Sequence, residues 1–287
     1  MQALSRLLIQ LFLLGAAYNL TSCHSGNEND QAAFAQKESV KCEAPDKQTT
    51  VLPRELSYRI VARYPHSTEA FTQGLAYRDG VLYESAGLYE KSSLSSRTLS
   101  SIEPTRQHKL ADQLFAEGAT LAGNEIVQLT WKSGKVFRYS LPGLEALQEQ
   151  QIKGEGWGLT FNGEHLINSN GSATLTFRHP AELAIIKTVD VTYANRPLQK
   201  LNELEWAYGC VLANIWHSDD IAFIEPESGK TLYTVSLAKL AAPEKQIHRQ
   251  HVANGIAYRH DTGNLLVTGK NWQWLYEIEL LLPQQQN

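Results

Sequence analysis

Apolar and polar residues alternate over short stretches from Ser57 onward, which is the pattern of β-strands. Turn residues such as Ser133-Gly134 and Asn162-Gly163 separate these stretches. Helical periodicity is weak, and Ser236–Ala242 is the best short helix candidate. The pattern therefore predicts an all-β fold. The clearest predicted strands are 58–64, 80–87, 125–131, 135–140, 163–169, 173–179, 210–216, 221–226, 264–270 and 274–280.

A period is visible inside this pattern. Five segments share one form: a small or acidic residue, an apolar residue, another small or acidic residue, and a bulky residue. They begin at Gly74, Gly118, Gly158, Glu203 and Gly255. Repeats of about 40–50 residues made of short strands are typical of propeller blades, so five repeats predict a five-bladed β-propeller. We expect the strand Tyr58–Tyr64 to complete the last blade beside Leu275–Leu280 and close the ring. A β-sandwich is the alternative, but it does not explain the period.

The residues at equivalent positions of the repeats form a candidate site. In a propeller, the innermost strands line the central axis, so the residues just before each repeat start should converge. They are Gln73, Glu117, Trp157, Asn202 and Asn254. A neighbouring ring follows from the ends of the second strands: Gly87, Trp131, Gly171, Trp216 and the turn that holds Lys270. Taken singly, a Trp is more often core packing and a Glu or Lys more often solvated. Their co-location favours a small-ligand pocket with aromatic walls.

Composition limits the class of protein. The chain has 287 residues, 43% of them hydrophobic and 20% charged, which is an ordinary globular balance. Its net charge of −4 gives no reason to expect a nucleic-acid partner. Three cysteines are too few for a disulfide scaffold. Two of them, Cys42 and Cys210, can pair in an oxidising compartment or remain free thiols.

The N-terminal segment is predicted to be a targeting segment. Arg6 precedes the apolar run Leu7–Leu20, which is short for a membrane span and suits a signal peptide. Leu20-Thr21-Ser22-Cys23 resembles the bacterial lipobox, so we expect cleavage after residue 22 and lipidation of Cys23. An ordinary secretory signal is the alternative. Residues 23–50 are polar and are expected to form a flexible tether to the propeller, residues 51–287. The expected location is the cell envelope, facing the periplasm or the cell surface.

Nine segments, in order, resemble the glutaminyl-peptide cyclotransferases of the plant and bacterial type. Each is weak alone, but the ordered set is specific and covers about residues 57–280. The segments are Ala70–Leu75, Tyr83–Tyr89, Glu117-Gly118, Gln128–Lys132, Gly156–Leu159, Leu201–Glu205, Ala213–Trp216, Asn254–Tyr258 and Val267–Lys270.

The resemblance implies a fold, a reaction and a site. The family fold is a five-bladed β-propeller, which agrees with the repeat count. Such enzymes turn the N-terminal glutamine of peptides or proteins into pyroglutamate and release ammonia. The acid/base residue of the family falls on Glu117. Asn202 and Lys270 are expected to stabilise the developing oxyanion. The substrate-binding residues of the family fall on Phe71, Gln73, Trp131, Trp157 and Trp216.

No cofactor or metal is expected for this reaction. The chain lacks His-Glu-x-x-His and any Cys-x-x-Cys pair, and His248-x-x-His251 is too sparse for a zinc site. The sequence does not decide whether the channel holds a structural divalent ion. The main alternative function is a non-catalytic propeller lipoprotein that binds peptides or scaffolds an envelope complex. A sugar lactonase would need several acidic ligands at the axis, whereas Glu117 alone is acidic among the five ring residues. We expect a monomer.

Overall fold

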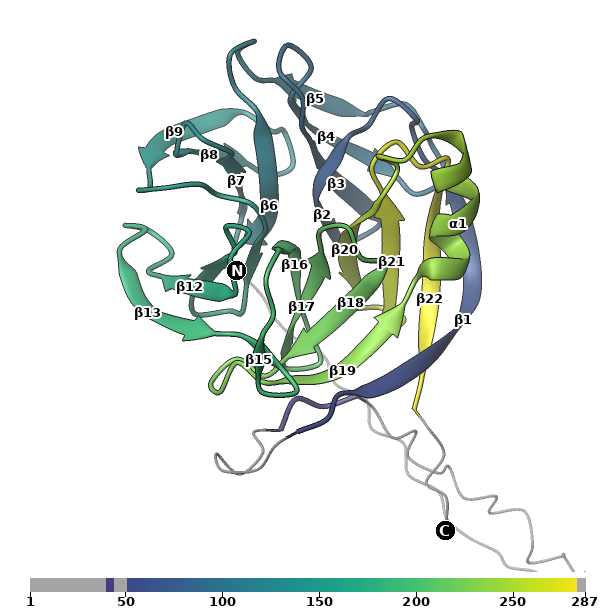
Figure 1. The fold of residues 1–287 in the computed structure, drawn as a ribbon. Helices are drawn as coiled ribbons and strands as arrows, with labels where there is room; N and C mark the ends of the chain where they lie inside the picture. Colours follow the sequence, from purple (N-terminus) through teal and green to yellow (C-terminus); the bar gives the residue numbers. More distant parts are fainter. Residues whose placement is uncertain (1–39, 44–50, 283–287) are drawn as a thin grey trace, which may run out of the picture. The chain divides into compact units, whose positions relative to one another are not determined.

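The structure, a computed structural model, describes residues 40–43 and 51–282, all within the compact unit Glu38–Asn287. Over these residues the chain forms 22 β-strands and one short helix, α1 (Ala238–Ile247), so the predicted all-β class is confirmed (Figure 1). The helix overlaps the candidate Ser236–Ala242. The predicted signal segment 1–22, Cys23 and most of the predicted tether 23–50 lie outside the described residues. None of the described helical structure has the length and apolar character of a membrane-crossing helix.

Three successive antiparallel sheets have four strands each, hydrogen-bonded in chain order. The first comprises β2 (Thr72–Arg78), β3 (Val81–Ala86), β4 (Ser93–Thr98) and β5 (Arg106–Lys109). The second comprises β6 (Ala116–Ala122), β7 (Glu125–Thr130), β8 (Lys135–Ser140) and β9 (Ala146–Gln151). The third comprises β10 (Leu159–Phe161), β11 (Leu166–Asn168), β12 (Thr174–Arg178) and β13 (Ile185–Asp190). A small hairpin follows, made of β14 (Thr192–Tyr193) and β15 (Arg196–Pro197).

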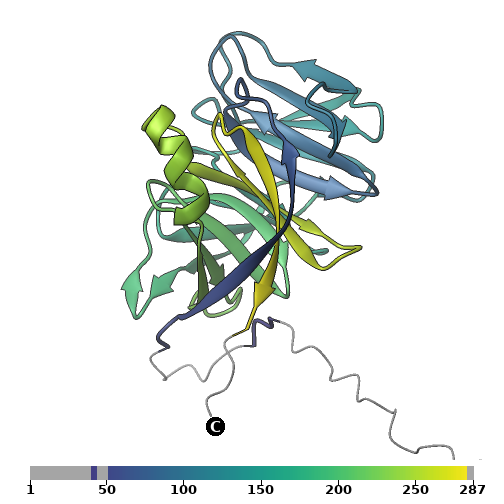
Figure 2. The same cartoon turned by 90° about the vertical axis from the view of Figure 1, so that its right-hand side faces the viewer.

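The remaining strands form one eight-stranded sheet in which β1 (Arg54–Pro65) joins two groups. One group is β16 (Leu201–Ala207), β17 (Cys210–Ile215), β18 (Asp220–Ile224) and β19 (Thr231–Ser236). The other is β20 (Ala253–Arg259), β21 (Asn264–Gly269) and β22 (Trp274–Leu281). The start of β1 pairs in parallel with β19, and Ser57–Pro65 pairs antiparallel with β22. Figure 2 shows β1, in dark blue, running along the yellow β22.

The first strands of these units meet in a cycle: β2 contacts β6, then β10, β16 and β20 follow, and β20 contacts β2 again. The glycines that begin the repeats allow this close approach. A Cβ on Gly118 would lie 2.5 Å from the backbone of Trp157 and Leu159, and one on Gly158 would overlap the carbonyl of Asn202. Side chains larger than hydrogen therefore do not fit at these positions.

The fourth repeat begins with Glu203 instead of glycine, and its side chain connects other repeats. Its two carboxylate oxygens accept hydrogen bonds from the backbone N–H of Leu75 at 3.3 Å and of Ile256 at 3.0 Å. The side chain is fully buried, and burial raises its pKa well above the usual range. Glu203 thus fastens the first and last repeats together at the axis.

Cys42 and Cys210 form a disulfide, which decides a pairing that the sequence left open. Cys210 lies on β17 in a buried hydrophobic cluster that also includes Val40. The backbone N–H of Cys42 donates to the carbonyl of Tyr208 at 3.2 Å. Residues 40–43, inside the segment predicted as a tether, are therefore fastened to the side of β17.

We expect loss of this disulfide to lower the free energy of unfolding by about 2–4 kcal/mol, because the bond closes a long loop in the unfolded chain. Thermal unfolding of Cys42→Ser/Cys210→Ser should occur at a lower temperature than that of the wild type. Dithiothreitol should lower the wild-type midpoint to the same value and leave the double variant unchanged. Equal midpoints for oxidised wild type and double variant would contradict the expectation.

Candidate active site

A cavity of about 420 Å³ opens where the first strands begin. It is lined by all eight residues that the sequence assigned to catalysis and substrate binding: Phe71, Gln73, Glu117, Trp131, Trp157, Asn202, Trp216 and Lys270. Four further residues line it without having been predicted: Phe115, His217, Gln250 and Val252. The eight residues assigned to catalysis and substrate binding are therefore brought together in one space.

Local irregularities in the first strands direct the polar residues into this cavity. The pairing register shifts between Thr72 and Gly74, between Ala116 and Ala119, and between Leu201 and Leu204. Gln73, Glu117 and Asn202 lie within these shifts. A β-bulge breaks the alternation of side chains and can re-aim one of them. Each of the three is nonetheless buried, with at most 4% of its surface exposed.

Hydrogen bonds between successive repeats hold the backbone at these positions. Ser85 donates from its hydroxyl to the carbonyl of Glu117. The N–H of Gly118 donates to the carbonyl of Trp157 at 2.6 Å, and the hydroxyl of Ser169 donates to the carbonyl of Asn202 at 2.6 Å. The cavity residues of neighbouring repeats therefore cannot move independently.

The ring residue Asn254 does not line the cavity but lies beneath it. Its side-chain amide donates to the carbonyl of Thr72 at 2.8 Å and to Oε1 of Gln73 at 3.1 Å. The amide thus orients Gln73, whose side chain faces the cavity. Asn254 itself is fully buried.

Glu117 is the acidic residue that lines the cavity. Burial raises its pKa well above the usual range, Lys270 opposes this shift, and the charge of Glu155 adds to it. Its Oε2 atom is buried without a hydrogen-bond partner among the described residues. A buried carboxyl with a free oxygen and a raised pKa can exchange a proton with a molecule bound in the cavity.

Lys270 is the cationic residue of the cavity wall. Burial lowers its pKa to about 8, and the nearby Glu117 opposes that shift. Its Nζ atom lies 4.5 Å from the centre of the Phe71 ring, within the range of a cation–π interaction. Its backbone N–H donates to the carbonyl of Val252 at 3.0 Å. The amine is thus held at the aromatic wall rather than in solvent.

Aromatic rings form the remaining walls in two edge-to-face pairs. Phe115 and Trp131 have ring centres 5.6 Å apart, and Trp157 and Trp216 also lie 5.6 Å apart. Trp216 is 38% exposed, so it lies at the mouth. The indole N–H groups of Trp131 and Trp157 both donate to Oε2 of Glu155, at 2.8 and 3.0 Å. A single carboxylate oxygen therefore joins the two pairs.

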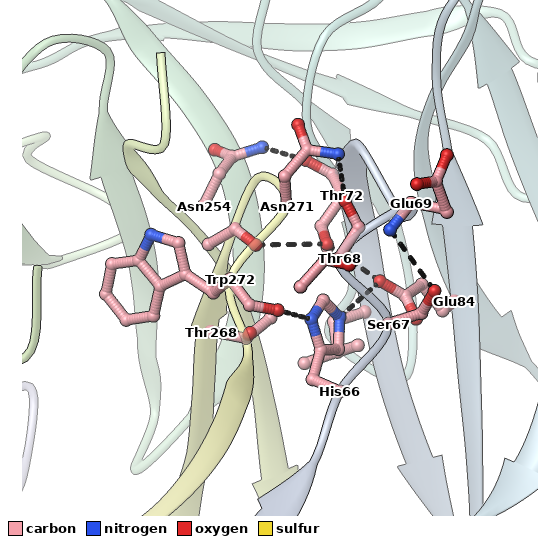
Figure 3. A network of polar contacts seen from close by, with 12 residues as sticks. His66, Ser67, Thr68, Glu69, Thr72, Glu84, Asn254, Thr268, Asn271 and Trp272 are labelled. Atoms are coloured by element: carbon pink, nitrogen blue, oxygen red, sulfur yellow. Dashed lines mark hydrogen bonds and ion pairs between the residues drawn. The ribbon is translucent and has the colours of Figure 1, made fainter. Parts of the chain in front are cut away.

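A second polar network fastens the segment that carries Phe71 and Gln73 to the segment that carries Lys270 (Figure 3). His66 contacts the carbonyl of Trp272 through Nδ1 at 2.7 Å and Oε1 of Glu84 through Nε2 at 2.9 Å. The hydroxyl of Thr72 donates to the same Glu84 oxygen at 2.7 Å. Farther along the segment, the side-chain amide of Asn271 donates to the carbonyl of Thr68 at 2.7 Å.

His66 and Glu84 form a buried ion pair in this network. Burial opposes ionisation of both groups. The charge and hydrogen bond of each partner outweigh this effect of burial on the other. The pKa of His66 is accordingly raised by the charge and hydrogen bond of Glu84. The pKa of Glu84 is lowered by His66, with further help from Thr72 and Arg97. Each group therefore favours the charged form of the other.

Across residues 40–43 and 51–282, His, Cys, Asp and Glu side chains do not gather in groups of three or more that could hold a metal ion. The acidic and amide groups at the cavity come from separate repeats.

The strands and the cavity define an all-β protein with an open cavity, whose walls are largely aromatic and which holds one buried carboxyl and one buried amine. Comparison with known proteins identifies the family. The family model for glutamine cyclotransferase matches residues 33–280. The chain belongs to this family, and the predicted resemblance is confirmed.

Two relatives agree with the assignment. The chain is 39% identical over 236 residues to a glutaminyl-peptide cyclotransferase of Arabidopsis thaliana, covering 79% of this chain and 73% of the relative. It also superposes on the crystal structure of Myxococcus xanthus glutaminyl cyclase with a TM-score of 0.75 and 35% identity. That match covers 79% of this chain and 98% of the other.

Four residues line the cavity without having been predicted. Two of them could have been identified from the sequence, and two could not. Phe115 and Val252 lie three residues before a repeat start, as Phe71 does, so one more comparison of repeat positions would have identified them. His217 and Gln250 lie in a turn and in the segment after α1, where the repeats do not correspond. Their place follows only from the three-dimensional structure.

We expect Glu84→Gln to lower the free energy of unfolding by about 3–5 kcal/mol, because it leaves His66 buried without its counter-charge. Glu84 contributes to the free energy of unfolding above its unfolded pKa of about 4.3. This contribution is lost as the pH falls through the lower pKa of Glu84 in the folded protein. The His66 contribution is present below about pH 6.5 and is lost as pH rises through its raised folded value. The difference between wild type and variant should therefore be largest between about pH 4.3 and 6.5.

Denaturant unfolding at several pH values measures this difference. Glu69→Gln is the matched control, because Glu69 lies three residues after His66 with its side chain 84% exposed. A Glu84→Gln protein as stable as the control at all pH values would contradict the role of the ion pair.

Proposed function

We propose that this protein is a glutaminyl-peptide cyclotransferase, which converts the N-terminal glutamine of peptides or proteins to pyroglutamate and releases ammonia. Family membership and the Arabidopsis relative support the activity. The observation that carries the mechanism is the buried, unpartnered oxygen of Glu117 inside an aromatic cavity beside Lys270.

The substrate contains both reacting groups. The nitrogen of its α-amine attacks the carbonyl carbon of its own side-chain carboxamide, and a five-membered lactam forms. The bond between that carbon and the amide nitrogen then breaks, and the nitrogen leaves as ammonia. Holding the side chain folded in a near-attack geometry can therefore supply several kcal/mol of the barrier reduction. The rings of Phe71, Trp131, Trp157 and Trp216 are the walls that hold it.

Glu117 carries the proton between the two nitrogens. An α-ammonium group has a pKa of about 7.7–8.0, so a proton must leave before or during the attack. The Glu117 carboxylate accepts this proton and donates it to the departing amide nitrogen. A pKa raised by burial suits both steps, because the group is then neither a very weak base nor a very strong acid.

The polar neighbours of Glu117 stabilise the intermediate and orient the substrate. As the amine attacks, negative charge develops on the carboxamide oxygen. Lys270 and Asn202 line the same cavity and are placed to stabilise that charge. Gln73, held by Asn254, orients the amide or amine of the substrate. None of these roles requires a metal, and we propose that the reaction proceeds without a cofactor.

We further propose that the sheets are the five blades of a β-propeller closed by β1. Three blades correspond to the three separate four-stranded sheets. The eight-stranded sheet divides at β1 into two four-stranded groups, β16–β19 and β20–β22 with β1. The cycle of contacts among the first strands supports this architecture.

We also propose that the protein is a monomeric lipoprotein of the cell envelope, anchored through Cys23 and facing the periplasm or the cell surface. The support is the motif Leu20–Cys23 at the end of an apolar run, in residues outside the described part of the chain. The Cys42–Cys210 disulfide is a second argument, because such bonds persist in oxidising compartments.

We expect Glu117→Gln to lower kcat for a Gln-initiated dipeptide by about 10²–10⁴-fold, because the proton carrier is lost. Ammonia release and loss of the free amine measure the reaction, and the unfolding midpoint verifies that the variant folds. A folded variant with near-wild-type turnover would refute the role of Glu117. A folded wild-type protein without ammonia release from several Gln-initiated peptides would instead favour a non-catalytic peptide-binding protein.

We expect chelators to leave turnover within about twofold of the untreated enzyme, because the proposed proton carrier and oxyanion groups are side chains alone. The test compares rates before and after prolonged dialysis against EDTA and 1,10-phenanthroline. Loss of activity that added zinc restores would refute the metal-independent mechanism.

A further inference from the structure

Glu155 occupies a distinctive place in the repeat pattern. It lies between β9 and β10, three residues before the repeat start Gly158. The first two repeats have phenylalanines at that position, Phe71 and Phe115, and both line the cavity. The third repeat therefore has a carboxylate where the two preceding repeats have an aromatic wall residue.

The carboxylate of Glu155 binds two walls at once. Its Oε2 atom accepts from Nε1 of Trp131 at 2.8 Å and from Nε1 of Trp157 at 3.0 Å. Trp131 follows β7 in one sheet, whereas Trp157 precedes β10 in the next. The Glu155 side chain thus joins the two rings, in addition to the backbone hydrogen bond from the N–H of Gly156 to the carbonyl of Trp131 at 3.2 Å. Hydrogen bonds to an ionised acceptor are about twice as strong as neutral ones.

Packing also supports both rings, and the Nζ atom of Lys132 lies 4.1 Å from the centre of the Trp131 ring. Trp131 packs edge-to-face on Phe115, and Trp157 does so on Trp216. The other side of Trp157 lies against Gly171, where an added Cβ would come within 2.8 Å of the ring. An indole ring held by such contacts can still slide or rotate within its own plane. The hydrogen bond at Nε1 restricts that motion.

We propose that Glu155 is a positioning residue for the cyclisation, which fixes the Trp131 and Trp157 rings at the spacing that holds the folded glutamine side chain. This proposal rests on the proposed function for its substrate. Glu155 acts through the two indoles. Its charge also contributes to the raised pKa of Glu117, so its replacement should alter the pH dependence as well as binding.

Two variants separate positioning from charge. Glu155→Gln retains a carbonyl oxygen that can accept both indole N–H groups but removes the charge. Glu155→Ala removes the acceptor and the charge. We expect Glu155→Ala to raise KM for a Gln-initiated dipeptide about tenfold and to lower kcat about tenfold. Glu155→Gln should change each by no more than about threefold. Its pH profile should move to lower pH, because the loss of a neighbouring negative charge lowers the pKa of Glu117.

A matched control and a second pair of variants address misfolding. Glu149→Ala removes an exposed glutamate from the preceding strand β9 and should leave kcat and KM unchanged. Trp157→Phe keeps an aromatic ring but removes the N–H donor, so it should raise KM in the same direction as Glu155→Ala. The double variant Trp157→Phe/Glu155→Ala should lose less than the product of the two single losses.

The indole N–H resonances in ¹⁵N-labelled protein provide a readout that does not depend on turnover. In Glu155→Ala two of them should move strongly, and in Glu155→Gln they should stay near their wild-type positions. Equal kinetic losses in both variants, or an Ala variant with wild-type kcat and KM, would overturn the proposal. If wild type proves inactive, the proposed function fails, while unmoved indole resonances in Glu155→Ala would separately overturn the positioning role.

Discussion

The structure depends on a closed set of buried hydrogen bonds between neighbouring repeats around the base of the cavity. Ser85 bonds the carbonyl of Glu117, and Ser169 bonds the carbonyl of Asn202. The side-chain oxygen of Asn214 accepts from the N–H of Gly255 at 2.9 Å, and Asn254 returns to the carbonyl of Thr72. Residues separated by 32 to 182 positions in the chain are thereby held at fixed distances. A cyclisation that depends on the geometry of its substrate needs such a rigid frame.

Burial has different consequences at two carboxyl groups of this frame. Both Glu117 and Glu203 are buried, and burial raises the pKa of each well above the usual range. The oxygens of Glu203 accept backbone N–H groups from two other repeats, so that carboxyl is committed to the fold. Oε2 of Glu117 has no such partner among the described residues. Burying Glu117 therefore costs free energy that no structural hydrogen bond to Oε2 offsets. Such a cost is expected at a functional group.

The period of the repeats made much of this site predictable. Glycines at Gly118 and Gly158 mark the close approach of neighbouring first strands, and the residue before each start enters the cavity in four of five repeats. Glu155 was missed because the position three residues before each start was not compared. Its partners also follow and precede strands of two different sheets. A contact between two indole N–H groups and one carboxylate oxygen produces no periodic pattern in the sequence.

Other features had no local signal at all. The Cys42–Cys210 disulfide joins residues 168 positions apart, and only the docking of residues 40–43 on β17 brings them together. The register shifts that aim Gln73 and Asn202 depend on how neighbouring strands pair, so alternation along one strand cannot predict them. His66 and Glu84 likewise became an ion pair through the meeting of the first and last repeats.

Exposure along the cavity indicates how the chemistry is divided between its base and its mouth. Glu117 and Lys270 are 4% and 5% exposed, whereas Trp216 at the mouth is 38% exposed. The two groups to which we assign proton transfer and charge stabilisation therefore lie at the more buried end of the cavity, where the proposed mechanism places the first residue of the substrate. The rest of a peptide must leave through the mouth past Trp216 and His217, whose rings lie 4.1 Å apart. A flat aromatic surface contacts many side chains without requiring hydrogen bonds from them. Under the proposed mechanism, selectivity is consequently expected to fall on the N-terminal glutamine rather than on the residues behind it.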